Sequence, residues 1–409
     1  MRLTTTFACL LLSIASGMAI GFNHANAAEK SVGTIHQPGS GIDLVSSDGR
    51  YRFELGGRIM IDYAKYREDR TTLGDGTELR RARIELEGAV DEWAYEFGVD
   101  VADEEGAAEV KDAYLTYLGW GKMVVKVGQF KQPFSLEEIT SSKYITFMER
   151  ALANTFAPGR TIGVGLQSYA MNTNMAVGLF GQAYDQDAQD EGDESSAAAA
   201  RLSYAPWHGK VSALHLGLSV NYLQPSSSSG GAAAVNFDSR PESHITDVKY
   251  LDTGDITDVS RVVKYGAELA WVSGPWSFQG EYLVAKVERN SGLPALEFQG
   301  WYVYGSWFLT GESRHYQLKK GAFGRTRPAT ASGAWELAYR VSSLDLNDQD
   351  ISGGAATQHT LGLNWYANAH TRFMLNLINA ANDIDADAGG DVSGNDKPQI
   401  IQLRGQVDF

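Results

Sequence analysis

The sequence predicts an all-β fold, an antiparallel transmembrane β-barrel of about sixteen strands. Three observations support this prediction. Stretches of roughly ten residues alternate apolar and polar side chains, short and long connections alternate between them, and the last strand ends in the aromatic residue Phe409. The 44 glycines and the 11% aromatic content also suit twisted strands and tight turns.

The first 27 residues have the pattern of a secretory signal peptide. A basic start is followed by an apolar run from Phe7 to Ile20 and by the small residues of a cleavage site at Ala25-Asn26-Ala27. The single cysteine, Cys9, lies in this segment, so disulfides and thiolate metal clusters are not expected in the exported chain. We expect a short periplasmic segment at 28–48 and the barrel at 49–409.

The strand prediction rests on side-chain parity. Trp93, Tyr95 and Phe97 are apolar, whereas the residues between them are small or polar, so one face suits lipid and the other water. The same alternation recurs in fifteen other segments, which with this one give about sixteen strands. These other segments begin near Arg50, Ala82, Ala113, Met123, Ile162, Asn174, Ala198, Val211, Arg261, Trp276, Glu297, Gly333, Gln358, Arg372 and Pro398.

The connections predict the orientation of the barrel. Short turns are expected near residues 90–92, 119–121, 171–173, 207–209, 273–275 and 368–370, and long polar connections at 185–196, 225–260, 344–356 and 382–397. Bacterial outer-membrane barrels keep short turns on the periplasmic side and long loops outside. The alternative interpretation of the C-terminal segment is the edge strand of a soluble β-sandwich. Such a sandwich has no reason to keep short turns on one side and long loops on the other.

Composition and strand number limit the function. The chain has 35 lysine and arginine residues against 50 acidic residues, a formal net charge of −15, which argues against a nucleic-acid-binding protein. About sixteen strands leave a water-filled lumen, whereas a plugged active transporter needs about 22. Diffusion of small solutes across the outer membrane is therefore the expected function.

Enzymatic and metal-binding motifs are not found in the sequence. There is no Gly-x-Ser-x-Gly motif, and the histidines of the exported chain lack the spacing of metal ligands. We therefore expect no enzyme activity, cofactor or metal site. Acidic runs at 185–194 and 383–391 leave open a binding or adhesion role, or weak bridging of divalent cations to lipopolysaccharide.

Several segments resemble one known family, the phosphate-selective porins O and P, in their order and spacing. The resemblance covers nearly the whole exported chain. It rests on Phe53-Glu54-Leu55-Gly56-Gly57-Arg58, Arg80-Arg81-Ala82, Thr140-Ser141-Ser142-Lys143, Glu149-Arg150, Leu309-Thr310-Gly311-Glu312, Gly333-Ala334-Trp335-Glu336-Leu337 and Leu361-Gly362-Leu363-Asn364-Trp365-Tyr366-Ala367-Asn368. The resemblance implies a homotrimeric outer-membrane porin for small anions, phosphate, pyrophosphate or related oxyanions, with a long loop constricting each pore.

That loop is expected at about 131–160. The segment contains Pro133 and Pro158 and has too little alternation to be a strand. Irregular backbone at membrane depth is tolerated where it lines a water-filled cavity, which independently favours an inward-folded loop. The alternative is an ordinary extracellular loop.

The resemblance also implies an anion pathway lined by cations and hydroxyl groups, because an anion that loses hydration needs fixed donors in its place. Parity places Arg81 and Arg83 on the polar face of their strand, whereas Arg80 reaches the lumen only if the strand bulges. The alternative for each residue is that it merely solvates the lumen wall. The candidate residues are Arg58, Arg80, Arg81, Arg83, Lys111, Lys126, Glu138, Ser141, Ser142, Lys143, Arg150 and Arg240.

Three positions depart from the phosphate-binding members of the family. Glu138 and Ala94 stand where those members have lysines, and Lys111 stands where they have an acidic residue. Replacing a lysine by a glutamate changes the local charge by two units, which at ~6 Å and an effective dielectric of about 20 costs a passing anion on the order of 3 kcal/mol per unit before screening. A porin without phosphate selectivity, general or specific for another solute, therefore remains the alternative.

Overall fold

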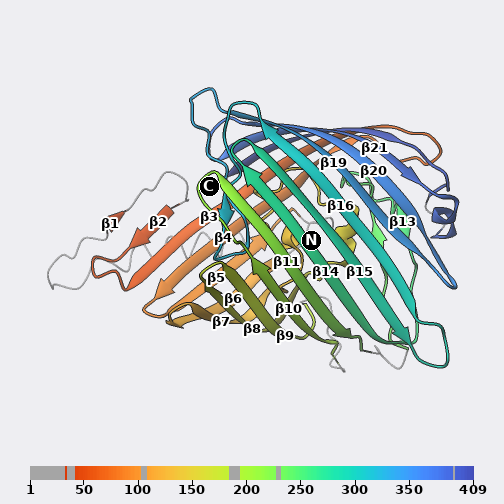
Figure 1. Cartoon of the computed structure of the whole chain (residues 1–409), viewed down its shortest axis with the longest axis horizontal. Coiled ribbons are helices and arrows are strands. Elements are labelled where there is room, and N and C mark those ends of the chain that lie inside the picture. The colour runs from red at the N-terminus through yellow and green to blue at the C-terminus, as the bar shows by residue number, and fades with distance from the viewer. Residues whose placement is uncertain (1–32, 35–41, 103–107, 184–193, 227–231, 390–391) are drawn as a thin grey trace, which may run out of the picture.

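The computed structural model describes residues 33–34, 42–102, 108–183, 194–226, 232–389 and 392–409. The expected signal peptide lies outside these residues. An eighteen-stranded antiparallel sheet dominates the structure and consists of β1 and β2 at the N-terminus and sixteen strands that close into a barrel (Figure 1). No helix of the described residues is long and apolar enough to cross a membrane.

The sixteen barrel strands agree with the sixteen segments predicted from alternation. They are β3 (Tyr51–Arg67), β4 (Gly76–Val90), β5 (Trp93–Asp100), β6 (Glu109–Trp120), β7 (Met123–Lys131), β8 (Arg160–Ala170), β9 (Thr173–Phe180), β10 (Ser196–Tyr204), β11 (Ser212–Gln224), β14 (Val259–Ser273), β15 (Trp276–Arg289), β16 (Leu296–Phe308), β19 (Ala334–Asp348), β20 (Ile351–Tyr366), β21 (Thr371–Asn382) and β22 (Gln399–Asp408). The predicted all-β barrel is therefore confirmed.

The shorter elements are not part of the barrel wall. Strands β1 (Gly33–Thr34) and β2 (Ile42–Val45) extend the edge of β3 away from the barrel (Figure 1). The connections contain α2 (Leu136–Ile139), η1 (Leu152–Phe156), β12 (Asp238–Ser239), β13 (Leu251–Asp252), β17 (Tyr316–Gln317), β18 (Ala322–Phe323) and η2 (Ile384–Gly389).

Pairing of the first and last barrel strands closes the sheet. Strand β22 runs antiparallel to β3, with Ile401 opposite Lys65. The C-terminal residue continues this pairing, because Gly57 N donates to Phe409 O at 2.9 Å and Phe409 N donates to Gly57 O at 3.2 Å. A Cβ on Gly57 would clash with the backbone oxygen of Arg83 and lie 2.8 Å from the Phe409 ring, so this junction requires glycine. The closed ladder leaves no unpaired sheet edge between these strands.

The outer surface has the side chains expected of a lipid-facing wall. Phe97, Leu115 and Val127 are 42–55% exposed although they are apolar, whereas the alternate positions point to the interior. Tryptophans gather at the end of the barrel with the short turns, where Trp276 stacks on Trp307 at 4.9 Å. Such a belt is typical of a membrane–water interface.

Two connections differ from the sequence prediction. The expected long loop at 344–356 is wrong, since β19 and β20 continue through it and turn between Asp348 and Ile351. Its polarity misled the prediction, because strands that extend beyond the membrane meet water on both faces. The connection at 309–333, on the side of the short turns, was not predicted to be long.

Three connections fold into the barrel. We call them the constriction loop (residues 132–159), the second inward segment (232–258) and the periplasmic segment (309–333). The first two pack in one apolar cluster against β14 to β20, in which Phe134, Phe156 and Tyr250 are fully buried. The periplasmic segment packs Tyr316 and Phe323 against Leu136 of the constriction loop. One half of the lumen is therefore filled, and the pore is displaced toward β3 to β9.

Candidate functional site

The open half of the lumen is a cavity of about 1030 Å³. Its wall comes from β3 to β10, the constriction loop and the periplasmic segment. Fourteen lysine and arginine side chains line it against seven aspartate and glutamate side chains. The cavity thus carries an excess of positive charge although the whole chain has a net charge of −15.

Arginines of the opposite wall hold the constriction loop in place. Arg340 on β19 donates to Glu149 O at 3.0 Å, and Arg372 on β21 donates to Ile145 O at 2.7 Å. Arg404 on β22 donates to Met148 O and forms ion pairs with Asp62 and Glu149. These contacts tie loop residues to strands on the far side, so the loop crosses the barrel.

A buried glutamate anchors the start of the loop. Ser135 caps α2 by accepting from Glu138 N, and the Glu281 carboxylate on β15 accepts from Leu136 N at 2.9 Å and Glu137 N at 2.7 Å. The carboxylate satisfies backbone donors that would otherwise be unpaired at the start of this short helix. The anchor fixes the height of the loop in the lumen.

A β-bulge brings two consecutive arginines to the lumen. Met60 pairs with Arg81 and Ile61 with Leu79, so Arg80 is the extra residue of β4. Both Arg80 and Arg81 line the cavity. Arg80 forms an ion pair with Glu149 at 2.9 Å, whereas the buried Arg81 Nε has no hydrogen-bond partner in the described part of the chain. The bulge explains how both arginines reach the interior despite their opposite parity.

Arg58 lies between a carboxylate and two hydroxyl groups. Its guanidinium donates to Ser142 Oγ at 2.8 Å and Ser141 Oγ at 3.3 Å and forms an ion pair with Glu85. Lys143 Nζ lies 2.9 Å from the second Glu85 oxygen. Four of the predicted residues are therefore brought together at one point of the pore, where Glu85 partly neutralises them.

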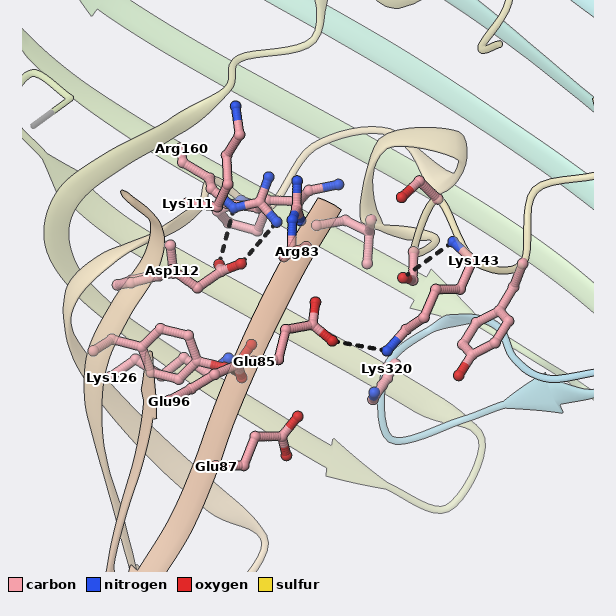
Figure 2. A pocket seen from close by; sticks show the side chains of 18 of the residues that line it. Arg83, Glu85, Glu87, Glu96, Lys111, Asp112, Lys126, Lys143, Arg160 and Lys320 are labelled. Carbon is pink, nitrogen blue, oxygen red and sulfur yellow. Dashed lines mark hydrogen bonds and ion pairs between the residues drawn. The ribbon is translucent and has the colours of Figure 1, made fainter. Parts of the chain in front are cut away.

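Further cations of the cavity are paired with acids of the same wall. Arg83 contacts Asp100 at 3.1 Å, Arg160 contacts Asp112 at 2.9 Å, and Lys111 pairs with Glu109. Figure 2 shows Arg83, Lys111 and Arg160 together on one side of Glu85, with Glu87 and Glu96 on the other side. The described cavity is thus richest in cations near the constriction loop.

Glu138 does not line the cavity but forms a buried ion cluster behind it. It lies 2.6 Å from Lys131 Nζ and 3.2 Å from Arg150 Nε. Burial would raise the pKa of the Glu138 carboxyl, but Arg150 and Lys131 outweigh that effect and lower the pKa to about 2. Glu138 therefore stays ionised at neutral pH and partly cancels two cations of the cavity.

Arg240 and the acidic runs were also candidates from the sequence, and the described parts of them lie outside the cavity lining. Arg240 lies in the second inward segment outside the cavity lining, where it donates to His244 O at 3.1 Å and contacts Asp247 at 3.1 Å. In the acidic run at 383–391, Asp383 accepts from Ala355 N at 2.9 Å and has a structural role. The run at 185–194 falls almost entirely outside the described residues.

Sequence reasoning missed Lys319 and Lys320, which line the cavity from the periplasmic segment. Asn174 Nδ2 donates to Lys319 O at 2.6 Å, and Arg201 donates to Gly321 O at 2.8 Å, so contacts with the barrel wall fix this position. The available signal was the interval between the strands near 297 and 333, which is too long for a turn and lacks alternation.

Five charged side chains of the cavity form no hydrogen bond or ion pair with another described residue. They are Arg81, Lys126, Lys319, Lys320 and Glu87. Lys126 lies over the Tyr114 ring at 4.4 Å from its centroid, and Lys319 lies over Tyr169 at 5.5 Å. Four of these five charges are positive, so they are the groups that a passing anion meets without displacing a partner.

No group of three or more histidine, cysteine, aspartate or glutamate residues within the described ranges is arranged to hold a metal ion. The charged cavity instead has the form of a permeation pathway, because it lies inside a closed barrel and is lined by strands and inward-folded connections.

Comparisons with known proteins agree with this architecture. Porin O of Pseudomonas aeruginosa is 29% identical to the chain over 429 residues, covering 93% of this chain and 96% of that protein. An anion-selective porin from Comamonas acidovorans has a similar fold, with a TM-score of 0.56, 15% identity and coverage of 88% of this chain and all of that one. The trimer form of OmpT from Vibrio cholerae has a TM-score of 0.54, 11% identity and coverage of 88% and 99%.

The family comparison covers the whole barrel. A family model described as phosphate-selective porin O and P matches residues 53–409, from the first barrel strand to the C-terminal residue. Together with the closed sixteen-stranded barrel, this match places the chain in the outer membrane. The chain therefore belongs to the phosphate-selective porin O and P family.

Proposed function

We propose that this porin conducts small anions selectively and that phosphate or a related oxyanion is its preferred solute. The observation that carries the proposal is the set of unpaired charges in the cavity, where four cations stand against Glu87 alone among the described residues. An ion in the pore responds to charges that are not already neutralised. The net charge of the chain therefore describes its other surfaces and not the pathway.

Arg81 is the central group of the proposed pathway. It lies at the bulge next to the constriction loop and has a free guanidinium, which offers several donors in a planar arrangement. An anion about 4 Å from one such charge gains roughly 4 kcal/mol at an effective dielectric of about 20, before screening by salt. That gain offsets part of the hydration that the anion loses on entering the narrow region.

The group around Arg58 supports an oxyanion as the preferred solute. Arg58, Ser141 and Ser142 place a guanidinium beside two hydroxyl groups, and such donors suit phosphate oxygens. The name of Porin O's family and the anion selectivity of the Comamonas porin are consistent with this preference. A phosphate at this point would compete with Glu85 for the same donors.

A porin without phosphate preference is the second candidate. Glu85 and Glu138 neutralise Arg58, Lys143, Lys131 and Arg150, which leaves fewer free cations than the sequence suggests. On this alternative, chloride and phosphate cross with similar ease. Blocking experiments separate the two candidates.

We further propose that the protein is a homotrimer in the outer membrane, in contact with lipid and lipopolysaccharide. The belt of exposed aromatic side chains supports the membrane contact, and the trimer form of OmpT, a protein of similar fold, is consistent with the assembly. Chemical cross-linking of the detergent-extracted protein tests the trimer.

The functional test is block of chloride current by phosphate in planar bilayers. For the wild type we expect millimolar or lower phosphate to reduce chloride conductance. The block should weaken about tenfold in Arg81→Gln, which corresponds to about 1.4 kcal/mol for one charge screened by water and salt. Arg261→Gln removes an exposed arginine of the outer rim and serves as the matched control. Absence of phosphate block in the wild type would favour the second candidate.

A further inference from the structure

Three glutamates form a row across neighbouring strands in the part of the cavity nearer the periplasm. In the sheet register Glu54 on β3 lies opposite Glu87 on β4, and Glu87 lies opposite Glu96 on β5. Like charges in directly opposed positions destabilise a sheet. A sheet that keeps this arrangement in its lumen wall gives up stability at that point, which is typical of functional positions.

Partners within the row are unequal. Glu54 pairs with Arg52 at 2.8 Å, and Glu96 accepts a hydrogen bond from the Tyr114 hydroxyl. Glu87, between them, forms no hydrogen bond or ion pair with any described residue and is exposed to the cavity. Its carboxylate is therefore available to a solute.

Free lysines share the same part of the cavity. Lys126 interacts electrostatically with Glu87, Glu96 and Lys320. Figure 2 shows Lys126 next to Glu96. Lys320 lies across from them, on the other side of Glu85 and Glu87 (Figure 2). The periplasmic segment brings Lys319 and Lys320 there through the contacts of Asn174 and Arg201 with its backbone. A solute that has passed Arg81 thus meets free ammonium groups together with one free carboxylate.

We propose that Glu87 is a specificity-determining residue of the permeation pathway, which favours phosphate esters and phosphonates that carry a primary ammonium group over those that lack one. The phosphoryl oxygens of such a solute pair with Lys126, Lys319 or Lys320 while its ammonium group pairs with Glu87. A plain oxyanion gains the lysine contacts but is repelled by Glu87. This inference rests on the proposed anion selectivity and specifies the solute class further.

The experiment compares two probes of similar size, ethylphosphonate and 2-aminoethylphosphonate, as blockers of chloride current in planar bilayers. The measured quantity is the ratio of their blocking constants in the wild type and in Glu87→Gln. Because the probes differ in net charge, the removal of any carboxylate charge from the cavity shifts this ratio to some extent, and a control variant must measure that general effect. Glu109→Gln is the matched control, because it removes one carboxylate charge from the same cavity at a position that pairs with Lys111.

We expect Glu87→Gln to weaken block by 2-aminoethylphosphonate relative to ethylphosphonate about threefold more than Glu109→Gln does, as for the loss of a partly solvated ion pair. Phosphate block should stay the same or strengthen in Glu87→Gln. A change of the ratio in Glu87→Gln no larger than that in Glu109→Gln, with phosphate block intact, would overturn this inference alone. A wild-type channel without anion selectivity would overturn the proposed function itself, and with it this inference.

Discussion

The two halves of the lumen use arginine in different ways. In the filled half, Arg340 is 1% exposed and pairs with Glu242 at 2.6 Å, and the buried Arg404 pairs with Asp62 at 2.6 Å. In the open half, Arg81 is unpaired within the described chain and lines the cavity. We infer that an inward-facing arginine contributes its full charge to the pathway only when that charge is left free. Paired arginines of the filled half hold the connections that narrow the pore.

The largest expected effect comes from breaking a pair in the filled half. Arg340→Gln leaves the Glu242 carboxylate buried without its cation, and it also removes the donor to Glu149 O. Such a change costs about 3–5 kcal/mol. We expect a lower unfolding midpoint in a heat-modified gel assay and noisier, larger single-channel currents as the loop loosens.

Arg340→Lys is the partner variant, since it keeps the charge but not the planar guanidinium. We expect it to restore part of the stability. Wild-type stability and current noise in Arg340→Gln would contradict the distinction between the two halves.

A smaller effect, on ion selectivity, is expected from Glu138, which lies between the filled and the open half of the lumen. Glu138→Gln keeps the shape of the side chain but releases Lys131 and Arg150, both of which line the cavity. Two additional free cations should raise the chloride-to-potassium permeability ratio about threefold, a partly screened effect. The zero-current potential in a KCl gradient measures the ratio, and a decrease would mean that Glu138 does not neutralise the pathway.

A weaker change is expected for the double variant Lys319→Gln with Lys320→Gln. Both side chains are exposed to the cavity near its periplasmic side, so water and salt screen them. Chloride conductance should fall about twofold in 0.1 M KCl and should equal that of the wild type in 1 M KCl, where the Debye length is about 3 Å. A loss that persists at 1 M KCl would indicate a change of the loop rather than of charge.

The smallest effect is expected from pH. Because Arg150 and Lys131 lower the pKa of Glu138 to about 2, below the ordinary value of about 4.3, this carboxylate stabilises the folded loop above pH ~4.3 and loses that contribution as the pH falls toward 2. Anion selectivity in the wild type should therefore change little between pH 7 and pH 4.5. A rise of selectivity within this range that is absent in Glu138→Gln would place the titration of Glu138 higher than we infer.

Much of the fold follows from sequence because a membrane acts on every strand in the same way. Lipid on one face and water on the other impose the alternation seen at Trp93, Tyr95 and Phe97, and all sixteen strands were predicted from it. The rule fails where both faces meet water, as in the hairpin around Asp348 and Ile351. It also carries no information on connections, so the inward fold of the periplasmic segment was missed.

Several residues that line the cavity were predictable from sequence, but the pairing of their charges was not. Resemblance and parity indicated Arg58, Arg81 and Ser142, which all line the cavity, and the condition set for Arg80, a bulge, is met. Pairing depends on contacts between distant segments, such as Arg58 with Glu85, that no local pattern records. Arg240 shows the same limit, because it contacts Asp247 and the backbone of His244 in its own segment and does not line the cavity.

The zero-current potential of single channels in a tenfold KCl gradient tests the central claim most directly, in the wild type and in Arg81→Gln. We predict a wild-type potential with the sign of the chloride equilibrium potential, and a shift toward zero in Arg81→Gln that Arg261→Gln does not show. A wild-type potential with the sign of the potassium equilibrium potential, or equal potentials in the wild type and Arg81→Gln, would contradict the claim that free charges of the open half set the selectivity.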